Sequence, residues 1–155
     1  MAAILLIDDS KVFRLVTAKI LRVAGHTVDT AEDGKAGLEL YRSGVYDLIV
    51  TDLVMPEMNG LALIAGLRHT EHPPRIIAMS GDSGLSQSDL LPEAKQLGAQ
   101  RILLKPVSPS VLMETVADVL AEPAPRPEAH AQPAQGAGPG DGAPPGAPAT
   151  SEASP

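Results

Sequence analysis

The stretch ILLIDDS near the amino terminus places two adjacent carboxylates, Asp8 and Asp9, directly after four apolar side chains. Buried, unpaired carboxylates are costly and raise each other's pKa, so stability alone does not explain this pair. Three later apolar runs end in Asp52, Ser80 and Lys105. Each of these residues has an ordinary explanation as a cap, a turn residue or a solvated side chain, but their recurrence at four strand ends indicates one shared site.

Carboxylates gathered at such a site require a cation. At about 4 Å, two of them repel by about 4 kcal/mol with an effective dielectric constant near 20. Oxygen ligands suit Mg²⁺, whereas the chain has no cysteine and its four histidines show no metal-binding spacing. An aspartate held against Mg²⁺ beside a lysine is arranged to attack a phosphoryl group and form an aspartyl phosphate, with metal and lysine neutralising the transferring oxygens.

The elements that must position these residues alternate along the chain. Apolar runs predict strands, and patterns of helical spacing predict helices. The strands are expected at 3–8, 27–31, 47–51, 75–80 and 100–104, and the helices at 10–24, 33–43, 61–70, a segment ending near 97, and 108–120. This alternation predicts a doubly wound α/β fold, a five-stranded parallel sheet with five helices covering both faces.

The evenness of the apolar runs indicates which strands are interior. The first, third, fourth and fifth runs are the most evenly apolar, so we expect these four to be the central strands. In such sheets ligands bind outside the carboxyl ends of the strands, where the strand order reverses. We therefore expect the acidic pair to lie close to three other side chains, those of Asp52, Ser80 and Lys105.

Composition excludes several classes of partner. The 155-residue chain has a formal net charge of −7, one phenylalanine, two tyrosines and no tryptophan, so we expect no nucleic acid partner. No apolar stretch has the length of a signal sequence or a membrane span, which predicts a cytoplasmic protein without a membrane partner.

The composition changes near residue 122. Residues 122–155 contain nine of the fifteen prolines and almost no large apolar side chains, so they cannot bury enough surface to offset their ordering entropy. We therefore expect one folded domain at 1–121 and a disordered Pro/Ala/Gly-rich tail at 122–155. An inert tail or a linker is favoured over a proline-rich ligand.

The densest motif is TDLVMPEMNG at 51–60, supported by IDDS, by MSG at the end of the fourth run and by LLKP at the end of the fifth. With these motifs in this order, residues 2–121 resemble the receiver domain of two-component response regulators. The resemblance implies a CheY-like, flavodoxin-like fold with strand order 2-1-3-4-5. It also implies a cis bond between Lys105 and Pro106.

The same resemblance implies roles for the site residues. Asp52 would be the phosphoacceptor, Ser80 the switch hydroxyl and Lys105 a contact to the phosphoryl group. Asp8, Asp9, Asp52 and the main-chain carbonyl of Val54 would hold Mg²⁺.

The implied function is signalling rather than ordinary enzyme catalysis. A histidine kinase or histidine phosphotransfer protein would phosphorylate Asp52, with Mg-dependent self-phosphorylation and dephosphorylation as the only chemistry. Output would pass through the face formed by the fourth helix, the fifth strand and the fifth helix. With no output domain in the chain, we expect a stand-alone regulator acting through protein contacts, as in chemotaxis or phosphorelays.

Several positions depart from the family pattern. Ile102 occupies the place of the usual aromatic switch residue, so either it reports activation through smaller packing shifts or the coupling runs through the loop after the fourth strand. That loop, GDSGLSQSD, is about three residues longer than usual, and we expect it to be mobile and to carry partner specificity. Val54 cannot orient an attacking water, whereas Asp82 could; we favour a long-lived phosphoryl group.

Rival functions find less support. A phosphatase of the haloacid dehalogenase type needs a second acid two residues after the nucleophile, where this chain has Val54. A nucleotide-binding fold needs a glycine-rich turn, and IDDSKVF contains neither GxGxxG nor GxxxxGK. A degenerate receiver that docks partners without phosphorylation remains the alternative.

Overall fold

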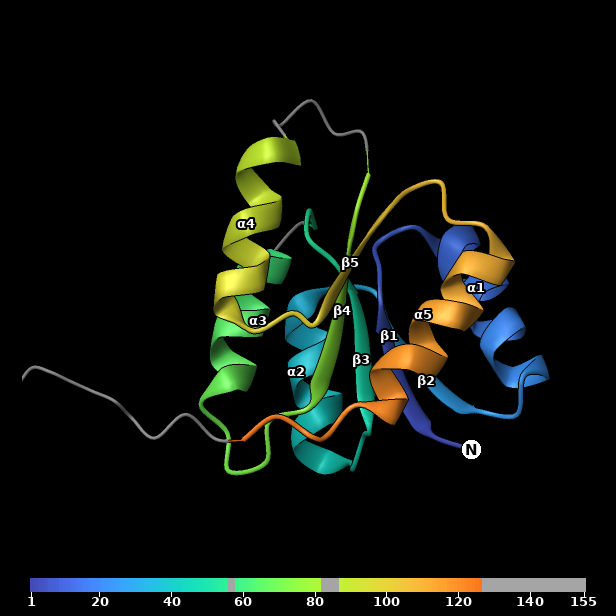
Figure 1. Cartoon of the computed structure of the whole chain (residues 1–155), viewed down its shortest axis with the longest axis horizontal. Helices are drawn as coiled ribbons and strands as arrows, with labels where there is room; N and C mark the ends of the chain where they lie inside the picture. Colours follow the sequence, from blue (N-terminus) through green and yellow to red (C-terminus); the bar gives the residue numbers. More distant parts are fainter. Residues whose placement is uncertain (56–57, 82–86, 127–155) are drawn as a thin grey trace, which may run out of the picture.

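The computed structural model describes residues 1–55, 58–81 and 87–126, and it contains five strands and five helices in strict alternation (Figure 1). The strands are β1 (Ala3–Ile7), β2 (Thr27–Ala31), β3 (Leu48–Asp52), β4 (Arg75–Ser80) and β5 (Arg101–Leu104). The helices are α1 (Lys11–Val23), α2 (Gly34–Ser43), α3 (Gly60–Arg68), α4 (Gln87–Leu97) and α5 (Pro109–Ala121). The bounds predicted from the sequence agree to within two residues wherever both ends were predicted.

The strands form one parallel sheet in the order β2-β1-β3-β4-β5. This order confirms the doubly wound fold, with the reversal of strand order between β1 and β3. The expectation that the fifth strand is central was wrong, because β5 pairs only with β4 and forms an edge. Helices cover both faces of the sheet, so an edge strand also carries apolar side chains, and evenness of hydrophobicity does not distinguish it from an interior one.

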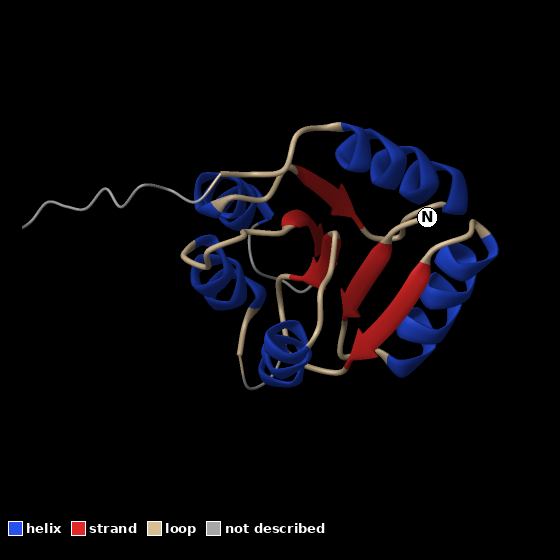
Figure 2. Cartoon of the chain, turned by 90° about the horizontal axis from the view of Figure 1, so that it is seen from below, coloured by secondary structure: helices blue, strands red, loops and turns tan. Residues whose placement is uncertain are grey.

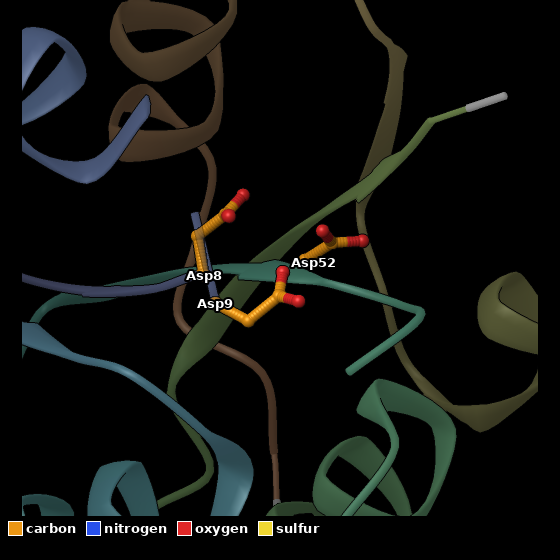
Figure 3. A group of neighbouring side chains, drawn as sticks. All are labelled: Asp8, Asp9 and Asp52. Carbon is orange, nitrogen blue, oxygen red and sulfur yellow. The ribbon is translucent and has the colours of Figure 1, made fainter. Parts of the chain in front are cut away.

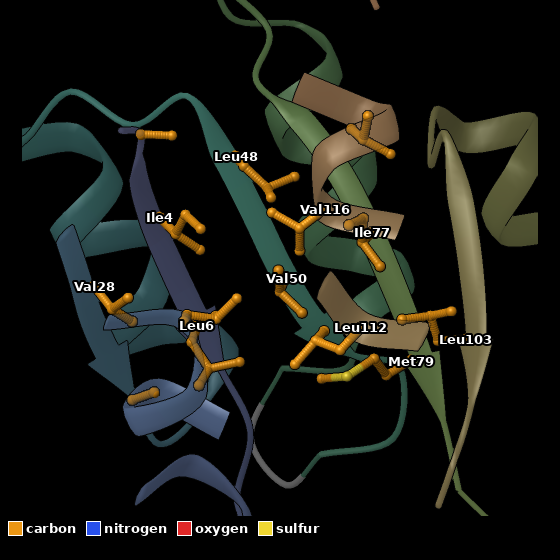
Figure 4. Close-up of a cluster of buried hydrophobic side chains, with 14 residues drawn as sticks. Ile4, Leu6, Val28, Leu48, Val50, Ile77, Met79, Leu103, Leu112 and Val116 are labelled. Carbon is orange, nitrogen blue, oxygen red and sulfur yellow. The ribbon is translucent and has the colours of Figure 1, made fainter. Parts of the chain in front are cut away.

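Alternate residues along each strand face opposite layers of helices, which surround the sheet in Figure 2. One core packs α1 and α5 against the sheet, with Ile4, Val50 and Leu112 among its members (Figure 4). The other packs α2, α3 and α4 against the opposite face, with Leu5 and Ile49 among its members. The interior strands are therefore buried on both sides.

Capping side chains determine where four of the helices begin. Ser10, Asp33, Asn59 and Ser108 each accept a hydrogen bond from the backbone amide three residues later, which satisfies an otherwise unpaired donor. The cap of α1 lies two residues after Asp8, so it also fixes how the chain leaves β1.

The described part of the chain continues past α5 as far as residue 126. The division between domain and tail at residue 121 therefore stays a prediction, and most of the predicted tail, residues 127–155, lies outside the described residues. Residues 82–86, most of the predicted mobile loop and with it Asp82, also lie outside them. None of the helices in the described ranges is both long enough and apolar enough to span a membrane.

Candidate functional site

Four of the predicted site residues lie together at the carboxyl ends of the strands. In the parallel register Ile7 lies beside Thr51, so Asp8 follows β1 at the level where Asp52 ends β3. Ser80 ends β4 and lies beside Leu104, the residue before Lys105. The sheet register thus aligns positions that are far apart in the sequence.

Lys105 joins two of the acids directly. Its Nζ donates to Asp8 Oδ2 at 2.5 Å and to Asp52 Oδ2 at 2.9 Å. Asp8 is fully buried and Asp52 is 5% exposed, so both pairs lie largely out of solvent. The ammonium also lies 4.2 Å from the centre of the Phe13 ring, which is a cation–π contact.

Backbone amides orient the same carboxylates. The Ser10 amide donates to Asp8 Oδ1 at 2.8 Å, and the Val54 amide donates to Asp52 Oδ1 at 3.1 Å. In each carboxylate, therefore, one oxygen accepts a hydrogen bond from a backbone amide two residues later and the other accepts one from Lys105. Arg14 adds a hydrogen bond of 2.7 Å to the Asp8 carbonyl, which ties the first turn of α1 to the end of β1.

Asp9 completes an acidic cluster with Asp8 and Asp52. One carboxylate oxygen from each of the three lies within 4.8 Å of the others, and Figure 3 shows the carboxylate of Asp9 turned toward Asp52. Asp9 is exposed and has no ion-pair partner among the described residues. Three carboxylates facing one ammonium leave a net negative site built from oxygen donors, which fits Mg²⁺ and gives zinc no nitrogen or sulfur ligand.

Burial and the ion pairs shift two pKa values. Burial raises the pKa of Asp8 above its usual range, although the Lys105 and Ser10 hydrogen bonds oppose this change. Burial by itself lowers the pKa of Lys105, but the hydrogen bonds and charges of Asp8 and Asp52 outweigh it and the net shift is upward. Lys105 is therefore a fixed positive charge at neutral pH.

The remaining predicted residues occupy the surroundings of the cluster. Ser80 is fully buried, and its hydroxyl donates to the Gly81 carbonyl over a long 3.5 Å, while its own carbonyl accepts from the Lys105 amide at 2.8 Å. The Lys105–Pro106 bond is cis, as the family resemblance implied. The role of the Val54 carbonyl as a metal ligand stays a prediction.

Three residues that support the site were not identified from the sequence. Phe13 and Arg14 contact Lys105 and the Asp8 carbonyl, and no local pattern in the first helix indicates this. Gly60 begins α3 so close to β3 that a Cβ there would lie 2.3 Å from the Asp52 carbonyl oxygen. A glycine directly after the Asn59 cap was a readable signal for this close approach, because helix starts do not otherwise favour glycine at that position.

Comparisons with known proteins all point to the same family. Residues 4–117 match the model of the response regulator receiver domain. The chain is 30% identical to the chemotaxis protein CheY of Thermotoga maritima, over 73% of this chain and 92% of that protein. It is 34% identical to the sensor kinase CckA of Brucella abortus, over 77% of this chain but 12% of that protein.

Solved structures give the same result. The chemotaxis response regulator CheY4 of Vibrio cholerae superposes with a TM-score of 0.69 at 30% identity, covering 77% of this chain and 98% of that one. The segment that the family model matches, residues 4–117, contains Lys105 and every residue of the acidic cluster.

Proposed function

This chain belongs to the response regulator receiver domain family, and on that premise we propose that Asp52 accepts a phosphoryl group from a histidine kinase or a histidine phosphotransfer protein. Receiver domains are signalling modules that interact with histidine kinases, and they bind Mg²⁺ in an acidic pocket. The observation that carries the proposal is the meeting of Asp52 with Lys105, Asp8 and Asp9 at one end of the sheet.

The proposed transfer uses the Asp52 carboxylate as the nucleophile. One of its oxygens bonds to the phosphorus of a phosphohistidine, the P–N bond breaks, and its electron pair returns to the imidazole nitrogen. Lys105, already 2.9 Å from Asp52 Oδ2, places positive charge where the phosphoryl oxygens would arrive. The backbone amide of Val54 keeps the carboxylate oriented for the attack.

Asp8, Asp9 and Asp52, with the Val54 carbonyl as the expected fourth donor, would hold the metal. Bound there, Mg²⁺ would neutralise charge on the phosphoryl oxygens during transfer. Without a cation, three clustered carboxylates repel an incoming phosphoryl group, and the single charge of Lys105 only partly opposes this repulsion. We therefore infer that phosphorylation requires the metal.

Signal output would begin at Ser80. Phosphorylation adds about −1.5 to −2 charges and new acceptor oxygens beside a buried hydroxyl whose contact to the Gly81 carbonyl is a long 3.5 Å. A phosphoryl oxygen is a stronger acceptor, so Ser80 would turn toward it and shift the loop after β4, biasing the face of α4, β5 and α5. Ile102, half-buried on β5, would follow by a small change in packing.

We infer that the protein works in the cytoplasm as a stand-alone regulator that signals by protein contacts. The match covers 92% of the chemotaxis protein CheY of Thermotoga maritima. In the sensor kinase CckA, by contrast, the matching segment is a small part of a longer protein. The self-phosphorylation and dephosphorylation chemistry belongs to this proposal as well.

Labelling with a small phosphodonor tests the proposed function. The chain is incubated with acetyl phosphate and Mg²⁺, and incorporation is measured for the wild type, for Asp52→Asn and for the exposed control Asp118→Asn. We expect stoichiometric, acid-stable and base-labile labelling that Asp52→Asn removes and Asp118→Asn preserves. Absence of labelling in the wild type would support a docking module that works without phosphorylation.

A further inference from the structure

The chain leaving α5 is fixed to the domain at Glu122. The Glu122 carbonyl accepts hydrogen bonds from Arg75 Nε at 3.1 Å and Nη2 at 2.8 Å, and its carboxylate pairs with Arg101. Arg75 begins β4 and Arg101 begins β5, so both anchors lie at the amino end of the sheet. The direction in which the chain continues is therefore set by the fold.

This anchored segment leads to the side of the domain that carries α4. In Figure 1 the orange segment after α5 crosses below β4 toward α3 and α4. Pro125 and Arg126 line a cavity of about 210 Å³ together with Pro73, Pro74 and Lys95. The described chain thus ends beside the carboxyl-terminal part of α4.

A second cavity begins at the same lysine. It lies between α4 and β5, measures about 570 Å³ and is lined by Pro92, Lys95, Arg101, Ile102 and Leu104; we call it the α4–β5 groove. Leu104 is 49% exposed, so the groove offers apolar surface, and two cations lie at its edge. Lys95 has no carboxylate partner among the described residues.

The next part of the chain has the complementary composition. Residues 127–133 read PEAHAQP, and the whole of 127–155 contains three acidic residues and neither lysine nor arginine. Glu128 comes two residues after Arg126, which lines the same cavity as Lys95. Seven extended residues span about 22 Å, more than the roughly 10 Å rise of β5, so the segment is long enough to follow the groove.

We propose that residues 127–133 dock in the α4–β5 groove, with Glu128 paired to Lys95 and the proline and alanine side chains against Ile102 and Leu104. The contact is intramolecular, and a tether this short gives a high effective concentration even where the intrinsic affinity is low. The segment would then shield the face through which we propose output. Only that consequence rests on the proposed function, because the docking itself involves neither Asp52 nor a phosphoryl group.

Paramagnetic relaxation in the full-length, unphosphorylated protein tests the docking. The natural chain has no cysteine, so Ala131→Cys provides a single site for a spin label. Docking predicts loss of amide signals at Ile102 and Leu104. If the segment is undocked, the loss should instead centre on Gly98, near the point where the chain leaves the domain, and spare Leu104; this result would overturn the proposal.

Charge variants identify the pairing. Lys95→Glu should restore the signals at Ile102 and Leu104, and combining it with Glu128→Lys should abolish them again. Lys35→Glu, at an exposed position of α2, is the matched control and should change nothing. Signal loss that persists in Lys95→Glu would refute the pairing. The spin-label experiment contains neither a phosphodonor nor Mg²⁺. A negative result would therefore not argue against phosphorylation of Asp52, and a failure of Asp52 labelling would not argue against docking.

Discussion

At the scale of residues, the site is governed by an imbalance of charge. Lys105 is shared between two buried carboxylates, whereas Asp9, in the same cluster, has no ion-pair partner in the part of the chain that the structure describes. The backbone amides of Ser10 and Val54 hold the other two carboxylates in place, so these carboxylates cannot simply turn apart. The folded state therefore retains repulsion that a divalent ion would relieve.

Asp9→Asn tests this imbalance through stability. Removing the unpaired charge should raise the melting temperature in EDTA by about 2 °C, a small change because solvent screens the exposed Asp9. Added Mg²⁺ should raise the melting temperature of the wild type by preferential binding to the folded state, and this increment should shrink in the variant. Differential scanning calorimetry with and without Mg²⁺ measures both effects.

The matched control is Asp118→Asn, which removes an exposed acid on α5 away from the cluster. It should keep the full Mg²⁺ increment. An Asp9→Asn protein that melts below the wild type in EDTA, or that keeps the whole increment, would show that Asp9 does not share a cation site with Asp8 and Asp52.

At the scale of elements, the start of α3 is packed directly against the end of β3. A Cβ at Gly60 would lie 2.3 Å from the Asp52 carbonyl oxygen and 2.7 Å from the Leu53 Cα, both backbone atoms that cannot move aside cheaply. This contact fixes the position of the strand end that carries Asp52. The same helix contains Gly66, where an added Cβ would have no neighbouring atom within 4 Å.

The two glycines give opposite predictions. Gly60→Ala should lower the free energy of unfolding by about 2–3 kcal/mol, because the backbone must shift to accept the methyl group. Gly66→Ala should raise it by about 0.5–1 kcal/mol, since alanine is the better helix former at an open position. Urea denaturation followed by circular dichroism measures both. Equal effects of the two substitutions would contradict the close packing of α3 on β3.

A second contact between elements joins β2 to the loop before β3. The Tyr46 hydroxyl donates to Asp29 Oδ2 at 2.7 Å. Burial, then this hydrogen bond and the Asp29 charge, raise the pKa of Tyr46 to about 12 from 10.0. Between these values the folded chain holds the phenolic proton more often than the unfolded chain does, so this contribution to stability is lost as the pH rises from about 10 to about 12.

The tyrosinate absorbance of Tyr46 can be isolated in a Tyr41→Phe background, because the chain has two tyrosines. We expect a midpoint near 12 for the folded protein, and a lower midpoint that is still above 10 when Asp29→Asn is added, because burial continues to raise the pKa. Circular dichroism at each pH confirms that the chain is still folded. A midpoint near 10 in the folded single variant would rule out the hydrogen bond to Asp29.

At the scale of the whole molecule, the fold could be predicted from the sequence because two patterns, one for strands and one for helices, alternate regularly. Continuous apolar runs and helical spacing alternate five times, and strand ends such as Asp52 and Ser80 were identified within a residue. The convergence of those ends also followed, because parallel strands bring their carboxyl ends to one edge. The specific motifs then identified the receiver family, which the family model and the structural comparison show.

Other features depended on contacts that no local pattern encodes. Apolar content could not show that β5 is an edge strand, because its residues are as apolar as those of the interior strands. The stacking of Phe13 on Lys105 joins residues more than ninety positions apart, and the anchoring of Glu122 by Arg75 and Arg101 depends on where the strands begin. Such pairings arise only once the sheet order is fixed.

The most direct measurement locates the phosphoryl group on one carboxylate. The protein is phosphorylated with acetyl phosphate and Mg²⁺ and reduced with borohydride, which converts a phosphoaspartate to homoserine, and the product is mapped by tandem mass spectrometry. We predict homoserine at position 52 alone, and none when EDTA replaces Mg²⁺. Homoserine at Asp8 or Asp9, or modification that proceeds equally in EDTA, would contradict the assignment of Asp52 as the metal-dependent phosphoacceptor.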